Sequence, residues 1–199
     1  MADTVGTTAI DIVEAGSVRV KEQKIMLYNY NKTRELNIYN QVTGFDITES
    51  IENATYTAVF YIADGLDLVD TFPLIGEEWI EIEFYIPDRE SKKYTFFVES
   101  VMLQESDEQN TKSTYVLSCT STGELINSYK TYTKRYGYPN PSLYHEAVEN
   151  IIKDDWKPGE DKLVEVERTV GFFDYVCNNI RPLQAIDLVR ERAVSTENN

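Results

Sequence analysis

The spacing of apolar and polar residues predicts a β-rich first part of the chain. The clearest run extends from Glu77 to Ile86, where Ile80, Ile82, Phe84 and Ile86 alternate with Trp79, Glu81, Glu83 and Tyr85. A period of two is typical of a strand with one buried side and one side facing water. Similar runs predict strands over Lys24 to Tyr30, Leu36 to Thr48, Thr55 to Ala63, Lys93 to Leu103 and Ser113 to Thr120. A change of phase at Gly44 indicates a bulge or bend.

The period changes to that of a helix near Ser121. Ser121 and Glu124 have the spacing of a capping box, which predicts a helix from Thr122 to Thr131. Asn140 followed by Pro141 predicts a second helix start, because asparagine caps a helix well and proline is tolerated at its first position. Pro182 predicts the start of a last helix.

These patterns predict an α+β fold. Residues 1–120 are expected to form an antiparallel β-barrel or sandwich, preceded by a loose arm over Met1 to Gly16. Residues 121–199 are expected to form a helical portion that is short for an independent core. This portion could also be the beginning of a longer second domain.

The charge balance excludes ordinary nucleic-acid binding. The 199 residues include 34 Asp and Glu against 19 Lys and Arg, a formal net charge of −15, whereas phosphate binding needs the opposite sign. No apolar run approaches the roughly 18 residues that span a bilayer. The first residues have neither the basic nor the apolar region of a signal peptide. Cys119 and Cys177 are expected to be reduced, packed thiols of a protein made in a cytoplasm.

Candidate chemistry is sparse. The single histidine, His145, has no neighbour at the spacing of a metal site or a catalytic pair. Asp64, Asp67 and Asp70 are spaced by three, but they lack the alternating oxygens of a calcium loop and indicate a capped turn. Glu77, Glu78, Glu81 and Glu83 could imitate a pair of glycosidase carboxylates, although an alternating strand explains the last two. We expect no enzymatic activity, no cofactor and no metal.

Three segments carry a resemblance to a known family. The first is FDITESIENATYTAVFYIADGLDLVDTFPLIGEEWIEIEFYI, with its DxLD and PLxG signatures and a strand that opens with GEE. The second is STYVLSCTSTGELINSYKTYTKRY, a strand that runs into a helix and then into an aromatic and basic stretch. The third is NNIRPLQAIDLVRERAV, a helix that begins at proline. In this order they resemble the baseplate central hub protein of contractile-tailed bacteriophages.

The resemblance implies a structural protein of the virion, assembled in the host cytoplasm. It implies a β-domain of tail-tube type in a homotrimeric ring between the tail tube protein and a spike or needle protein, among other baseplate subunits. DNA would pass through the ring without specific binding, and no membrane would be involved. Full hub subunits carry two tube-like domains and this chain has room for one, so we expect either an N-terminal portion of a longer hub, which is the favoured interpretation, or a shortened relative.

Two sets of residues are expected to serve such an assembly. The strand from Lys93 to Leu103 is apolar on both sides, which favours a subunit interface made by Tyr94, Phe96, Phe97, Val101 and Leu103. Glu81 and Glu83 are expected to line the conduit as an acidic face that repels DNA.

Two other functions remain open at this stage. A β-sandwich module that binds carbohydrate or protein could use Trp79 and Tyr85 as an exposed aromatic platform. A hydrolase would need two carboxylates in a concave site with a raised pKa. The module predicts a monomer, the hydrolase predicts turnover, and the hub predicts an oligomer with neither turnover nor cofactor.

Overall fold

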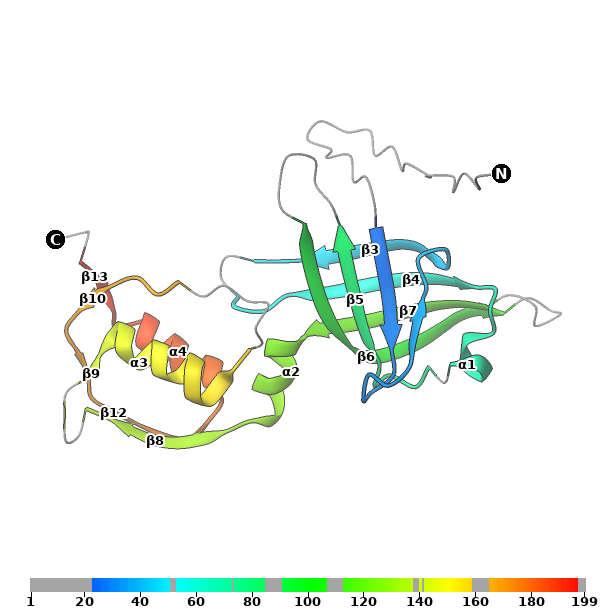
Figure 1. The fold of residues 1–199 in the computed structure, drawn as a ribbon. Helices are drawn as coiled ribbons and strands as arrows, with labels where there is room; N and C mark the ends of the chain where they lie inside the picture. Colours follow the sequence, from blue (N-terminus) through cyan, green and yellow to red (C-terminus); the bar gives the residue numbers. More distant parts are fainter. Residues whose placement is uncertain are drawn as a thin grey trace. The chain divides into compact units, whose positions relative to one another are not determined.

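Figure 1 shows the computed structural model of the chain, which describes residues 23–50, 53–72, 74–84, 91–106, 113–137, 140, 142–158 and 165–196. The predicted arm over Met1 to Gly16 therefore lies outside the described residues. The chain divides into two compact units. We call Met1–Thr48 with Thr57–Thr120 the β-unit, and Glu49–Tyr56 with Ser121–Asn199 the mixed unit. Each is described by itself.

The β-unit is built on one antiparallel sheet of seven strands in the order β2-β1-β5-β6-β7-β4-β3. A short helix, α1, lies between β4 and β5 along the chain. The elements are β1 (Gln23–Tyr28), β2 (Glu35–Asn37), β3 (Val42–Thr48), β4 (Thr57–Asp64), α1 (Leu68–Thr71), β5 (Trp79–Phe84), β6 (Lys92–Ser106) and β7 (Ser113–Ser121).

The sheet curls because β6 is long enough to belong to both of its halves. This strand has 15 residues and bends, so that its first half runs beside β5 and its second half beside β7 (Figure 1). The curl brings Phe45 of the edge strand β3 against Phe84 of β5, with stacked ring centroids 6.4 Å apart. Residues distant in the strand order therefore share one interior, and the sheet forms a half-barrel.

The interior of the β-unit follows the alternation in the sequence. Ile80 and Ile82 of β5 are fully buried, as predicted, and so are Phe96 and Val98 of β6. In β7, which was predicted as a strand over Ser113 to Thr120, the alternate residues Tyr115, Leu117 and Cys119 are buried. Tyr85 and Ile86, which were predicted to extend β5, lie outside the described residues.

The predicted strand from Leu36 to Thr48 is wrong as a single element. It is two strands, β2 and β3, separated by a turn in which the Ile38 carbonyl accepts hydrogen bonds from the N–H groups of Gln41 and Val42. The side chain of Ile38 is buried, so an apolar residue that looked like a strand position anchors the turn instead. The irregularity predicted at Gly44 is confirmed by a register shift between Val42 and Gly44.

The mixed unit contains helices and more strand than the sequence predicted. Its longest strand pairing is the antiparallel ribbon of β8 and β12, and α3 and α4 contribute residues to the same buried cluster as this ribbon (Figure 1). The core consists of Tyr136, Ala147, Ile151, Phe173, Cys177, Ala185 and Val189. The elements are α2 (Thr122–Tyr129), β8 (Tyr132–Tyr136), β9 (Ser142–Leu143), α3 (Tyr144–Asn150), a π-helix (Ile151–Trp156), β10 (Thr169–Val170), β11 (Phe172–Phe173), β12 (Tyr175–Ile180), α4 (Pro182–Arg190) and β13 (Val194–Ser195).

The helix starts in the mixed unit were predicted with mixed success. The Ser121 hydroxyl accepts from the Glu124 N–H at 3.4 Å, so α2 begins as predicted, although it ends at Tyr129 rather than Thr131. The helix start predicted at Asn140 is wrong, and Pro141 lies outside the described residues. Ser142 and Leu143 instead pair with β11, which delays the start of α3 to Tyr144. The start of α4 at Pro182 is confirmed. The α+β class is correct, but residues 121–199 are not simply helical.

Candidate functional site

The candidate catalytic residues of the sequence are used in local structure. His145 is half-buried, and its N–H donates to the Thr169 hydroxyl at 3.0 Å while its Nδ1 accepts from the Thr169 N–H at 3.2 Å. These two hydrogen bonds link α3 to β10. No group of three or more His, Cys, Asp or Glu that could hold a metal ion occurs among the described residues.

The two buried carboxylates of the β-unit each organise a turn. Asp64 accepts from the N–H groups of Leu66 at 2.9 Å and Leu68 at 2.7 Å, which confirms the predicted capped turn before α1. Glu78 accepts from the N–H groups of all three residues that precede it, at 2.7, 2.9 and 3.0 Å. A carboxylate with its oxygens occupied by backbone donors has a structural role that the sequence did not reveal.

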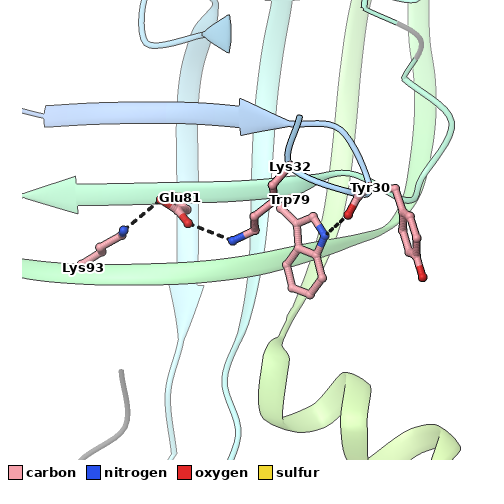
Figure 2. Close-up of polar contacts among 5 residues, drawn as sticks. All are labelled: Tyr30, Lys32, Trp79, Glu81 and Lys93. Carbon is pink, nitrogen blue, oxygen red and sulfur yellow. Dashed lines mark hydrogen bonds and ion pairs between the residues drawn. The ribbon is translucent and has the colours of Figure 1, made fainter. Parts of the chain in front are cut away.

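The most developed polar arrangement of the β-unit lies on the outer face of β1, β5 and β6, as Figure 2 shows. Glu81 of β5 lies between two ammonium groups, with Lys32 Nζ at 3.0 Å from Oε1 and Lys93 Nζ at 2.9 Å from Oε2. Lys32 also lies over the ring of Trp79, 5.1 Å from its centroid. We call Lys32, Trp79, Glu81 and Lys93 the outer-face cluster.

The charges within this cluster compensate one another. Burial alone would raise the pKa of Glu81, but hydrogen bonds from Lys93 and Lys32 outweigh burial and lower this pKa below its usual value. The same contact with Glu81 raises the pKa of Lys93. Glu81 is therefore a carboxylate and Lys93 an ammonium over the whole physiological pH range.

Trp79 is not an open platform. Its indole Nε1 donates to the Tyr30 carbonyl at 2.9 Å (Figure 2). Its ring also meets Phe97 edge-on, with centroids 5.2 Å apart. Lys32 occupies part of the remaining ring surface. Tyr85, the other member of the platform proposed for carbohydrate binding, lies outside the described residues. The arrangement thus gives Trp79 a packing role in which its polar end is satisfied.

The cluster holds the loop between β1 and β2 in place. Asn29 accepts from the Arg34 N–H at 2.9 Å through its side-chain oxygen, and its side-chain NH₂ donates to Asn31 and Thr33. Lys32 adopts a left-handed backbone conformation with φ of 53°, which is uncommon for a residue other than glycine. This segment lies between the strands predicted over Lys24 to Tyr30 and Leu36 to Thr48. The contact between Lys32 and Glu81 depends on the pairing of β1 with β5, which local periodicity cannot indicate.

The residues expected to form a subunit interface fall into two groups. Phe96 is fully buried inside the β-unit, where its ring packs edge-on against Phe60 at 5.8 Å, so its side chain serves this unit's own core. Tyr94, Phe97 and Val101 are half-buried, and Leu103 is 57% exposed. The interface itself, like the acidic face of Glu81 and Glu83, stays a prediction.

Both cysteines are free and buried. Burial raises the pKa of the thiols of Cys119 and Cys177, so both are protonated at neutral pH. Cys177 accepts a hydrogen bond from the Tyr132 hydroxyl at 3.7 Å in the core of the mixed unit. Burial also raises the pKa of Tyr136, to about 12. These groups are neutral core residues.

No helix in the described part of the chain is long and apolar enough to span a membrane. No protein-family model and no curated protein matches the sequence. Among solved structures, the chain is similar to a prophage tail protein, gp18 of Listeria monocytogenes EGD-e, with a TM-score of 0.51 and 11% sequence identity. The match covers 85% of this chain and 46% of that chain, so the chain spans less than half the length of this neighbour. The likeness shows a fold shared with a phage tail protein.

Proposed function

We propose that this protein is a structural component of a phage tail, located in the baseplate hub, where a ring of subunits joins the tail tube to the central spike and lines the DNA conduit. The observation that carries the proposal is the structural likeness to a prophage tail protein over 85% of the chain. This share is larger than either unit alone. Shared folds often host different functions, so the placement in a hub rests on the segments that resemble that family.

The surface of the β-unit supports a role in an assembly. Met102 and Leu103, neighbours on β6, are 61% and 57% exposed. Side chains of this kind are more often buried, and because consecutive strand residues point to opposite sides, the two leave exposed apolar surface on both sides of this stretch of β6. We propose that this part of β6 contacts the neighbouring subunit of a homotrimer.

The charge of the chain supports a conduit that DNA does not bind. The formal net charge is −15, and a surface with the same sign as phosphate repels DNA in a confined channel. Glu81 is compensated by two lysines, so this role depends on the overall acidity of the β-unit more than on that side chain. We propose a structural protein without enzymatic activity.

Two measurements test the proposal. Light scattering after size exclusion, over a range of concentrations, should give three times the chain mass of 22.9 kDa. Immunogold electron microscopy of tail particles, prepared from cells that carry the gene, should place the protein at the end of the tail tube. A particle labelled along its length, or unlabelled while the protein stays in the soluble fraction, would contradict the hub assignment.

A further inference from the structure

One end of the β-unit carries a small groove with exposed apolar walls. Tyr30 and Ile75 line it together with Phe72, and Arg34, Glu77 and Glu78 supply its polar atoms. Its volume is about 230 Å³, which lies below the roughly 300 to 1,000 Å³ of sites for small molecules and cofactors. The groove therefore suits one amino-acid side chain better than a cofactor.

The backbone that carries the Tyr30 wall is held in place, although the residue is 67% exposed. Its carbonyl accepts from Trp79 Nε1, and the side-chain hydrogen bonds of Asn29 hold the rest of the loop. Arg34 donates to the Thr71 carbonyl at 2.9 Å and lies 5.2 Å from the ring centroid of Phe72, so the loop is also joined to the segment after α1.

The opposite wall is fixed by a different group. Ile75 is 71% exposed, but its N–H and those of Gly76 and Glu77 all donate to the buried carboxylate of Glu78. Gly76 has a backbone φ of 94°, a conformation that residues other than glycine rarely adopt. Two exposed apolar residues are thus held on rigid turns, which lowers the entropy lost when a partner binds between them.

The charge around the groove selects among partners. Glu77 is exposed at its rim, Glu78 forms part of its lining, and Arg34 is the single cation that lines it among the described residues. The carboxylate of Glu78 is already bound by three backbone N–H groups, so Glu77 is the carboxylate that the groove presents to a partner, beside Arg34 and within a chain of net charge −15. Because potentials of opposite sign favour association, an apolar side chain flanked by lysine or arginine fits this surface.

We infer that the groove between Tyr30 and Ile75 is a docking site for a protein partner that inserts one apolar side chain flanked by basic residues. The inference goes beyond the proposed function and does not depend on it, because the groove lies entirely within the β-unit and needs no ring.

The test uses the full chain, with its isoleucine methyl groups labelled for NMR, and three blocked pentapeptides as probes. The first has leucine between two pairs of lysines, the second replaces leucine by glycine, and the third replaces the lysines by glutamates. At low salt the leucine–lysine peptide should shift the Ile75 methyl signal in a saturable manner. Binding should weaken by about tenfold or more without the leucine, which corresponds to the transfer of one such side chain from water. The glutamate peptide should bind more weakly than the lysine peptide.

A variant and a matched control complete the test. Tyr30→Ala should abolish the saturable shift, whereas Met102→Ala should leave it unchanged, because Met102 is comparably exposed, at 61%, but does not line the groove. Equal shifts with all three peptides, or a shift that survives Tyr30→Ala, would overturn the docking site. An equal response to the lysine and glutamate peptides would overturn the basic character of the partner. Failure to form a ring or to label tails would contradict the proposed function only.

Discussion

Gly123 and Trp156 provide a sharp test of the packing of the mixed unit. A Cβ added at Gly123 would lie 2.9 Å from Cζ2 of Trp156 and 3.3 Å from Cβ of Pro158. Carbon atoms that are not bonded to each other prefer about 3.5 to 4.0 Å. Trp156 is buried, and its indole N–H donates to the Gly123 carbonyl at 2.8 Å. We therefore expect Gly123→Ala to displace a side chain that has little room to move.

The magnitude follows from opposing contributions. Alanine in place of glycine within a helix stabilises by about 1 kcal/mol. Overpacking costs about 1 to 3 kcal/mol, and weakening the hydrogen bond from Trp156 costs about 1 kcal/mol more. We expect Gly123→Ala to destabilise the mixed unit by about 1 to 3 kcal/mol on balance.

Hydrogen exchange measures this change separately in each unit. Peptides from α2 should exchange about 5 to 150 times faster in Gly123→Ala, whereas peptides from β5 should be unaffected. Trp156→Phe removes Cζ2 and with it the closest contact. In that background Gly123→Ala should be neutral or stabilising by up to about 1 kcal/mol. If the effects of Gly123→Ala and Trp156→Phe on the free energy of unfolding were additive, with a coupling below about 0.5 kcal/mol, the reasoning would be refuted. A stabilising effect of Gly123→Ala alone would also refute it.

Three further changes test the β-unit. Glu78→Ala should cost about 2 to 4 kcal/mol in urea unfolding, because three backbone donors lose their acceptor, whereas Glu77→Gln next to it should change stability by less than about 0.5 kcal/mol; equal costs would contradict the assigned contacts. Phe96→Ala should lower the free energy of unfolding by about 3 to 5 kcal/mol. Leu103→Ala should leave that free energy unchanged and lower the oligomer mass measured by light scattering. An unaltered mass would exclude Leu103 from the interface. Glu81→Gln should lower the free energy of unfolding by about 1 kcal/mol at low salt, and by less in 1 M salt. Since the folded-state pKa of Glu81 is lowered from 4.5, its contribution should be complete above that pH and disappear as the pH falls further; a difference that persists at pH 2 would argue against the ion pairs.

The sequence predicted those elements whose burial alternates along one strand. The inner residues Ile80 and Ile82 of β5 were identified correctly because period-two spacing is a local property of a half-buried strand. The start of α4 at Pro182 was also predicted, since proline is favoured at the first position of a helix. Local rules sufficed in these cases.

The failures share one physical cause, which is pairing between residues distant in the sequence. Ile38 has the pattern of a strand but anchors a turn, because its N–H donates to the Ile25 carbonyl of β1. Asn140 has the chemistry of an N-cap, yet α3 begins at Tyr144 because Leu143 pairs with Phe172. The outer-face cluster could not be predicted for the same reason, since Lys32 meets Glu81 only through the order of strands in the sheet.

The signatures that carried the resemblance turn out to be structural. Asp64 of the DxLD signature caps the turn before α1, and Glu78 of the strand opening binds the N–H groups of Ile75 and Gly76 in the PLxG signature. These two carboxylates are buried and bind backbone N–H groups, so they fix the connection between β4 and β5. A signature made of turn-forming residues identifies a way of folding, and a shared fold does not by itself fix a function. The functional difference between such proteins should therefore lie in the exposed residues that these turns present, and Ile75, held by Glu78, is one of them.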